Sequence, residues 1–540
     1  MRTLDVVIIL IFLVGMPLLG VLIGGKQKSG NDYFVSDKGI KWWVVCLSVV
    51  SAETSTLTVL SVPTISYLAK PEAGGMTYLT LALGYIVGRI VVAFILLPKY
   101  VAGDLVTAYA FLGKRFGNGM QATTSATFQI TRLLADAIRL FATAIPIKLV
   151  LKAYGIDASY WAIIIVLGIA LVFYTSMGGV RAVVWVDAIQ MLWYLLGAVA
   201  VIWVLTDRLP DGWFDKAVDA NKFQIFDFSS NWLTATYAFL PAFFGGAVFA
   251  MASHGTDQLI VQRLMSTRNV RAGQKALIAS GVVVFFQFAL FLFIGAMLSA
   301  FYNNATPTAP KDKGGLGLGA NDELFGNFIV TEMPSGLSGF VIAGILAAAL
   351  SSSLGALASA SVTDIWEKVV KRPLTDQERL RMGRIWTMIW AGLTIIVAGA
   401  FAQFNAKTSD PIVIQALGIA SYTYGALLGA FLLGLIIKKA RQADAVVAFL
   451  VTVVVMAYVI LGVKFVGTVP LDPKAPLPPW DHIEWFNFSK ADAKKNVNSL
   501  VSWWNVPLGV IITLAVGGLM SLRHKDDEPE TEEATAAKAT

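Results

Sequence analysis

A polar break interrupts an apolar segment of membrane length near the start of the chain. Residues 42–62 read WWVVCLSVVSAETSTLTVLSV, and the break is the hydroxyl-rich, acid-containing stretch at residues 51–56. Backbone inside a bilayer must satisfy its own hydrogen bonds, so such a break needs a physical cause. Either the helix unwinds and offers backbone carbonyls to a cation, or it only kinks and packs against its neighbours. These residues alone leave both interpretations open.

The rest of the chain places this segment in an all-α polytopic membrane protein. Of 540 residues, 56% are apolar and 14% are charged, with a mean hydropathy of +0.68. Soluble proteins carry about 25% charged residues. The apolar residues form blocks about as long as a membrane helix, and about 13 spans are predicted. These are residues 4–25, 41–69, 76–99, 121–151, 158–178, 183–206, 234–261, 272–302, 336–366, 384–405, 411–437, 443–467 and 501–522.

The composition argues against several other classes of protein. Cys46 is the only cysteine, so neither an internal disulfide nor a cysteine-rich metal site can form. No phosphate-binding loop for ATP occurs, and the three histidines show no metal-ligand spacing. No nucleophile–base pair is evident, so we do not predict an enzyme. Basic residues in short loops account for the net charge of +7, which indicates membrane orientation rather than nucleic-acid binding.

Loop basicity predicts the N-terminus outside and the C-terminus inside the plasma or inner cell membrane. Lys and Arg recur in every second loop, for example Lys26, Arg115, Arg268 and Lys438, whereas the alternate loops hold few of them. Short loops rich in Lys and Arg stay on the cytoplasmic side. An odd number of spans agrees with termini on opposite sides.

A second break is expected in segment 234–261, around Gly245-Gly246. It lies five spans after the first, which is the pattern of an inverted-repeat transporter with two five-helix halves. The predicted organisation is a first helix with a basic loop (1–40), a first repeat (41–206), an outer loop (207–233), a second repeat (234–437), additional helices with an outer loop (438–522) and a disordered cytoplasmic tail (523–540).

Segment 336–366 carries a run of small residues, AAALSSSLG at residues 347–355. Such residues commonly allow close helix packing. Alternatively, the Ala349 carbonyl lies three and four positions before the Ser352 and Ser353 hydroxyls, so all three would share one helix face. Together with carbonyls freed at the first break, these oxygens would suit a dehydrated sodium ion.

Charged residues inside predicted spans are candidate functional groups. Arg132, Asp136 and Arg139 lie four and three positions apart, so they share one helix face. They form either a structural ion-pair ladder or a site where an arginine binds a solute carboxylate bidentately. Because two arginines balance Glu53 and Asp136, a neutral or zwitterionic solute is also compatible. Arg89 is a further intramembrane charge with no obvious partner in the sequence.

Several motifs together resemble the sodium/solute symporter family, over about residues 5 to 465. That family includes sodium-coupled transporters of sugars, proline, pantothenate, sialic acid, iodide and monocarboxylates. The matching stretches are Asp32-Tyr33-Phe34 leading to Trp42-Trp43, Gly178-Gly179 followed by Ala182-Val183-Val184-Trp185, Asp187-Ala188-Ile189-Gln190, Asp257-Gln258 with Val261-Gln262-Arg263, and Ala347 to Ser353.

The resemblance implies a leucine-transporter-like five-plus-five inverted repeat with broken helices and alternating access. The family's main sodium site would fall on the carbonyls of Ser51, Thr54 and Ala349 and on the hydroxyls of Ser352 and Ser353. Asp187 matches an aspartate at the inner end of the sodium path. Gly355 and Ala356 stand where some members place hydroxyls for a second sodium ion, so one Na⁺ per cycle is expected.

We therefore predict a sodium symporter for a small polar organic solute, including carboxylate-bearing solutes. The solute pocket is expected around Glu53, Thr56, Thr58, Arg132, Asp136 and Arg139. The predicted partners are the solute, Na⁺ and the lipid bilayer, with no nucleic acid. A proton-coupled carrier using Glu53 or Asp136 remains an alternative, as do, more remotely, a cation channel and a membrane sensor. The sequence predicts neither the solute nor the oligomeric state.

Overall fold

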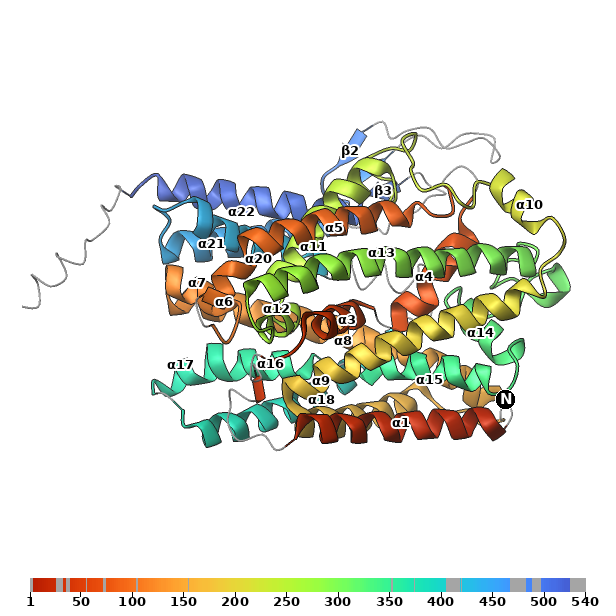
Figure 1. Cartoon of the computed structure of the whole chain (residues 1–540). Coiled ribbons are helices and arrows are strands. Elements are labelled where there is room, and N and C mark those ends of the chain that lie inside the picture. The colour runs from red at the N-terminus through yellow and green to blue at the C-terminus, as the bar shows by residue number, and fades with distance from the viewer. Residues whose placement is uncertain are drawn as a thin grey trace, which may run out of the picture.

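Long apolar helices run side by side along the molecule (Figure 1). The computed structural model describes residues 3–25, 33–34, 39–54, 56–70, 74–102, 105–153, 155–350, 353–372, 374–404, 418, 420–466, 482–487 and 497–524. Within these residues, 7 helices are long and apolar enough to cross a membrane, or up to 8 if one bent pair counts as a span. The other predicted spans coincide with helices that are shorter, more polar or interrupted, so the count of about 13 stays a prediction.

The first half of the chain forms the helices on which the first break depends. Their bounds are α1 Thr3–Gly24, α3 Trp42–Glu53, α4 Thr56–Leu68, α5 Tyr78–Ile95, α6 Leu97–Ala102, α7 Tyr109–Phe116, α8 Asn118–Ala153, α9 Tyr160–Thr206 and α10 Trp213–Asp219. The long α9 bends at Gly179, whose φ of 59° is open to glycine at little steric cost. Its two arms correspond to the predicted spans 158–178 and 183–206.

The second half contributes a further series of helices and a small sheet. Their bounds are η1 Pro241–Gly245, α11 Gly246–Gly255, α12 Gln258–Met265, α13 Val270–Phe301, η2 Lys311–Lys313, α14 Glu323–Thr331, α15 Leu337–Leu350, α16 Leu354–Ala360, η3 Ser361–Trp366, α17 Glu367–Val370, α18 Asp376–Phe404, α20 Tyr424–Ile436, α21 Gln442–Gly462, β1 Lys464–Val466, β2 His482–Glu484, β3 Val497–Ser499, η5 Ser502–Trp504 and α22 Asn505–Ser521. The antiparallel sheet has the order β2-β1-β3 and belongs to the predicted outer loop.

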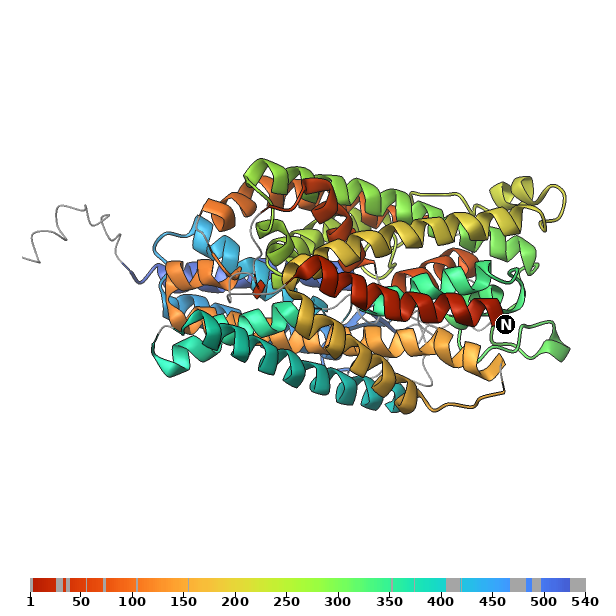
Figure 2. The same ribbon diagram turned by 60° about the horizontal axis from the view of Figure 1, so that its bottom comes forward.

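The outward faces of the helices are apolar. On α1, Ile11 is 67% exposed and Leu22 is 79% exposed, and the helix buries only a small part of its surface. Large apolar side chains left uncovered along whole helices indicate contact with lipid. In both views the N-terminus lies at one end of the bundle, and α6, α7, α17 and the end of α22 lie at the other (Figures 1 and 2).

The first predicted break is present. α3 ends at Glu53 and α4 begins at Thr56, and the axes of the two pieces differ by 63°. Thr54 has φ −78° and ψ 106°, an extended conformation that stops the helix, while Ser55 lies outside the described residues. The extended backbone means that the last carbonyls of α3 lack donors from a following helical turn.

The prediction of a second break at Gly245-Gly246 is wrong. Both glycines are helical, with φ/ψ of −62°/−40° and −60°/−41°, and the chain passes from η1 into α11 without interruption. Glycine is needed at these positions because neighbouring atoms approach the helix closely. A Cβ on Gly245 would lie 2.4 Å from the Trp503 carbonyl oxygen. The helix instead ends at Gly255, and α12 starts after Thr256 and Asp257. Close packing, which glycine allows in membrane helices, explains the pair.

Glycines also bring α5 against the broken second helix. A Cβ on Gly84 would lie 2.2 Å from the Phe243 carbonyl oxygen, and one on Gly88 would lie 2.2 Å from that of Ala247. Their spacing of four places both on one face of α5. This contact fixes the helix that carries Arg89 beside the helix that carries His254.

The ammonium group of Lys222 caps the C-terminal end of α4. Lys222, in the predicted outer loop 207–233, donates to the carbonyls of Ser66, Tyr67 and Ala69 at 3.1, 2.9 and 3.0 Å. Carbonyls at a helix C-terminus carry partial negative charge and favour such a cation. Burial lowers the pKa of the Lys222 ammonium. The second half of the broken helix, α4, is therefore tied to the segment that carries Lys222.

Candidate functional site

The end of α3 at the first break carries buried oxygen atoms. Ser51 and Thr54 are fully buried, and the Ser51 hydroxyl has no hydrogen-bond partner within the described part of the chain. The Thr54 hydroxyl donates to Oε1 of Gln287 on α13, at 2.9 Å. The carbonyls at the end of α3 also lie at the negative end of the helix dipole, which favours a cation. Neutral oxygen ligands of this kind suit sodium.

Glu53, the last residue of α3, is part of a charged cluster. Its carboxylate pairs with Nη2 of Arg89 on α5, and its Oε2 lies 3.6 Å from Nε2 of His254 on α11. Arg89 is fully buried and also donates to the Ser280 hydroxyl at 2.8 Å. The intramembrane Arg89, which showed no partner in the sequence, is thus neutralised by Glu53.

Arg132, Asp136 and Arg139 share one face of α8 as predicted, but only two of them are ion-paired. Arg132 lies 3.1 Å from Asp136 and 3.6 Å from Asp257. Arg139 instead donates to the Ala52 carbonyl at 2.7 Å, with a longer contact of 3.5 Å to that of Glu53. Among the described residues, Arg139 has no carboxylate within ion-pair distance. Its guanidinium lies directly against the first break.

The same face of α8 reaches the serine-bearing segment. The Ser353 hydroxyl donates to Oδ2 of Asp136, only three residues before Arg139, about 4.5 Å along the helix axis. One turn of α8 therefore contacts both the Ala52 carbonyl and Ser353. These two contacts of α8 link the two predicted halves of the sodium site.

The remaining predicted residues have the following positions. Ala349 is the penultimate residue of α15, and Ser353 precedes α16 with φ −89° and ψ 1°. Ser352 lies outside the described residues. The Thr56 hydroxyl donates to the Ile345 carbonyl of α15 at 3.1 Å and receives a bond from Thr143 at 2.9 Å. Thr58 is buried on α4.

Asp187 contacts the α3 side of the break, and its carboxylate is paired with Arg263. Its Oδ2 accepts bonds from Nη2 of Arg263 at 2.8 Å and from the Ser48 hydroxyl at 3.0 Å, and the aspartate is fully buried. Ser48 is one turn before Ser51 on α3. Asp187 and Arg263 therefore join α9 and α12 to α3, the first half of the broken helix.

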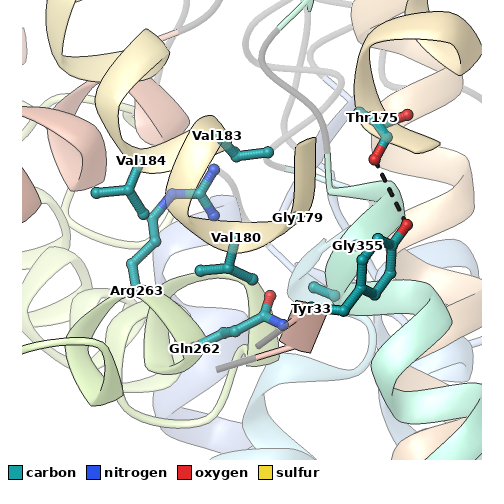
Figure 3. Close-up of a pocket in the computed structure, with 10 residues that line it drawn as sticks. Tyr33, Thr175, Gly179, Val180, Val183, Val184, Gln262, Arg263 and Gly355 are labelled. Carbon is teal, nitrogen blue, oxygen red and sulfur yellow. Dashed lines mark hydrogen bonds between the residues drawn. The ribbon is translucent and has the colours of Figure 1, made fainter. Parts of the chain in front are cut away.

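A small cavity adjoins this pair (Figure 3). Its volume of about 20 Å³ is enough for about one water molecule. Arg263 and Gln262 line it from α12, and Tyr33 closes it by donating to the Thr175 carbonyl at 3.4 Å. Gly355 and Ala356 also line it, at the positions where hydroxyls for a second ion were expected to be missing.

Four contributors to the site were not predicted as site residues, although Asp257 belongs to one of the motifs quoted above. Gln287, Asp257, His254 and Tyr424 all contact predicted residues or their partners. Asp257 is the N-cap of α12, accepting from the Leu259 amide at 2.9 Å. A Thr-Asp pair before an apolar run is a helix-start signal, so it could have located the second break. The sequence carries no comparable signal for Gln287.

Neutral oxygen atoms, rather than a cluster of metal-binding side chains, lie at the first break in the described part of the chain. Within the described residues no group of three or more His, Cys, Asp or Glu could hold a metal ion, whereas carbonyl and hydroxyl oxygens surround the first break. Broken helices with charged partners inside an apolar bundle define a class, the polytopic secondary transporters.

Comparison with known proteins gives the family. The sequence model of the sodium:solute symporter family matches residues 33–452, and the chain belongs to this family. The chain is 28% identical over 466 residues to the sodium/sialic acid symporter NanT of Aliivibrio fischeri, covering 85% of this chain and 88% of the relative. It is 24% identical over 457 residues to the human sodium/iodide cotransporter, covering 83% and 68%.

Solved structures agree on the fold. A Na⁺-coupled sialic acid symporter in a substrate-bound outward-open state superposes with a TM-score of 0.78 at 21% identity, covering 97% of this chain and 98% of the other. The nucleobase-cation-symport-1 family transporter Mhp1 gives 0.58 at 10% identity, covering 95% and 98%. The leucine-transporter-like fold is thereby supported. The protein is a multi-pass membrane transporter and not an enzyme, and Na⁺ is its co-transported ion.

Proposed function

We propose that this protein couples the inward movement of one Na⁺ to that of a small polar solute bearing a carboxylate, by alternating access. The proposal rests on the side-chain contacts of Arg139. It is the one cation of the Arg89, Arg132 and Arg139 set without a carboxylate partner among the described residues, and it lies at the first break. An arginine in this position can bind a planar carboxylate through two parallel hydrogen bonds.

The pairing of the buried charges, rather than their sum, supports a solute anion. Three arginines and three acids cancel, but both Asp136 and Asp257 lie beside Arg132, and no acid among the described residues pairs with Arg139. Glu53 balances Arg89, while Arg132 lies between Asp136 and Asp257. Arg132, a predicted solute residue, is therefore better suited to hold α8 against α12. Gln287 adds a buried amide nitrogen that has no partner within the described residues, and this nitrogen could donate to a solute hydroxyl or carbonyl.

Three relatives carry names that agree with this class of solute. NanT and the symporter SiaT of Proteus mirabilis, 28% identical, are sodium/sialic acid symporters, and the human sodium-coupled monocarboxylate transporter 1 is 22% identical. Sialic acids and monocarboxylates share a carboxylate. We assign this shared group, and no particular solute, to the present chain.

The sodium ion would bind to the Ser51, Thr54 and Ala349 carbonyls and to the Ser352 and Ser353 hydroxyls. The contacts of α8 with both Ala52 and Ser353 support this placement, as does the bond from Thr56 to Ile345, one turn before Ala349. An ion there would hold the inner half of the broken helix against α15 and α16. Of the predicted solute-binding residues, Glu53 ends α3 while Thr56 and Thr58 begin α4, and Asp136 contacts Ser353.

Inward release would pass Asp187, Ser48 and the small cavity beside Arg263. We place the N-terminus outside and the C-terminus in the cytoplasm. The basic residues near α7 and α17 lie at the same end of the bundle as the C-terminal end of α22 (Figure 1), and such residues favour the cytoplasmic side. One positive charge moving inward down a potential of 100 mV contributes about 2.3 kcal/mol. Proton coupling through Glu53 is disfavoured because Arg89 already compensates its negative charge.

A thermal-unfolding screen of the purified protein tests this proposal. A ligand that binds only the folded state raises the unfolding temperature. We expect N-acetylneuraminic acid or a short monocarboxylate to raise it in NaCl but not in choline chloride, and the corresponding amide to have no effect. Arg139→Gln should abolish the response to the carboxylate, whereas Arg139→Lys should keep part of it. An equal response of Arg139→Gln and the wild type would refute the carboxylate role.

A further inference from the structure

A groove opens on the lipid-facing surface near the start of α13. Its volume is about 550 Å³, and its walls come from the first residue of α3, the end of α5 and the first turns of α13. Trp42, 41% exposed, and Phe94, 62% exposed, form its apolar sides. Gln274 joins two of the walls by donating to the Ala93 carbonyl at 3.1 Å. This groove is separate from the sodium and solute groups described above.

Two cations stand at the mouth of this groove. Arg271 and Lys275 are exposed, line the groove and lie four residues apart, so they project from one face of α13. Neither has an ion-pair partner within the described residues. Residues 39–50, 89–102 and 266–282, which build the walls and their flanks, contain no Asp or Glu, whereas Lys41, Lys99 and Arg268 add further positive charge.

Apolar side chains continue from the groove toward the middle of the membrane. On α5, Ile90 and Val87 are exposed and lie one and two turns beyond Phe94, and on α13, Val282 and Phe286 are exposed beyond Lys275. The two helices pack against each other. A ligand for this surface must therefore combine a negatively charged head with a long apolar part.

We propose that the groove binds one anionic phospholipid of the cytoplasmic leaflet. The phosphate would lie between Arg271 and Lys275, the Trp42 indole would stand at the level of the headgroups, and an acyl chain would follow Phe94. Basic pockets between membrane helices on the cytoplasmic side bind anionic headgroups, and tryptophan is enriched at that depth. A free anion would gain nothing from the apolar walls, which favours the lipid.

Occupation of this groove would also constrain the helix that carries the proposed sodium site. Trp42 begins α3, the half-helix whose other end holds the proposed sodium carbonyls, and Trp43 packs edge-on against Trp185 of α9 with ring centroids 5.9 Å apart. A lipid bound to both α3 and α13 would therefore favour one position of α3. Binding is the primary claim, and it does not depend on the identity of the solute.

Native mass spectrometry of the whole protein, with phosphatidylglycerol and phosphatidylcholine of equal chain length, tests the proposal. We expect wild-type protein to retain one phosphatidylglycerol in preference to phosphatidylcholine. Arg271→Gln with Lys275→Gln should weaken that preference roughly tenfold to thirtyfold, the loss expected for two surface cations. The charge-conserving pair Arg271→Lys with Lys275→Arg should restore it.

A matched control is Arg381→Gln with Lys438→Gln, which removes the same two charge types from exposed positions outside the groove. We expect this pair to keep the preference for phosphatidylglycerol. An equal loss in both double glutamine variants would show only general surface attraction and would overturn the proposal, as would the absence of any preference in the wild type. The sodium-dependent thermal response of each variant verifies that it is folded.

Discussion

Two helices of the bundle are interrupted, and the backbone at the two interruptions has different partners. At the break between α3 and α4, the Ala52 carbonyl accepts from Arg139, and the Ser51 hydroxyl has no partner within the described residues. At the break between α11 and α12, the Gly255 and Thr256 carbonyls accept from the Tyr100 and Tyr109 hydroxyls.

The acidic residues at the two breaks differ in the same way. Glu53 ends α3 and has one arginine, Arg89, with His254 further away. Asp257 starts α12, where it caps the helix at Leu259, accepts from the Tyr424 hydroxyl at 2.7 Å and lies near Arg132. Protein groups thus satisfy the second break, while the first leaves the oxygens that we propose as sodium ligands. An interruption in a membrane helix alone does not create an ion site.

The largest expected effect concerns the two acids. Glu53→Gln leaves Arg89 charged and buried without a carboxylate, which costs about 3–5 kcal/mol of stability. Asp257→Asn should cost less, because Arg132 keeps Asp136 and asparagine can still cap the helix. Chemical unfolding in detergent compares the two, with exposed Asp376→Asn as the control. A loss in Asp257→Asn equal to that in Glu53→Gln would contradict the assigned difference.

Removal of the Ser353 hydroxyl should weaken sodium binding. Because a hydrogen-bonding or ligating group to a charge contributes about 1.5–3 kcal/mol, Ser353→Ala should raise the half-effective Na⁺ concentration about tenfold to a hundredfold. Na⁺-induced thermal stabilisation, which needs no solute, measures it. As a control, Ser359→Ala removes a buried serine hydroxyl within α16, and this variant should respond to Na⁺ like wild type. A wild-type response of Ser353→Ala would place the ion elsewhere.

A smaller effect is expected at the second break. Tyr109→Phe removes the donor to the Thr256 carbonyl and should lower stability by about 1–2 kcal/mol. The half-effective Na⁺ concentration should not change, since this carbonyl belongs to a break that protein groups already satisfy. The same two measurements, unfolding and Na⁺ stabilisation, separate these outcomes. A clear shift in sodium affinity would mean that both breaks contribute to ion binding.

The smallest effect is expected for Ser51→Ala. The proposed ligand is the carbonyl, which alanine retains, and the lost hydroxyl has no partner within the described residues. Stability should change by less than about 0.5 kcal/mol, and sodium affinity should change by less than about twofold. A tenfold weaker response to Na⁺ would identify the hydroxyl, rather than the carbonyl, as the ligand.

The first break was predictable and the second was misplaced for a physical reason. A run of hydroxyl and acidic residues at 51–56 has no comfortable place in a continuous lipid-facing helix, so the local sequence indicates an interruption. Glycine is ambiguous, because it permits both irregular backbone and close packing. At Gly245 the contact with Trp503, more than 250 residues away, determines which one occurs.

Among the arginines, the sequence narrowed the candidates without choosing between them. Arg132 and Arg139 share a face of α8 by spacing alone. Their different roles depend on what stands opposite: Asp257 near Arg132 and the Ala52 carbonyl near Arg139. Likewise, no local pattern connects Glu53 to Arg89 or Asp187 to Arg263, which come together only when distant helices pack.

The sequence by itself determined that the chain is a helical membrane protein, and which apolar segment carries a polar interruption near the start of the chain. These properties follow from the transfer of each residue into hydrocarbon, which depends on local composition. The tertiary structure alone decided which buried charges neutralise each other and that Arg139 is left over, because pairing requires contacts between helices far apart in sequence.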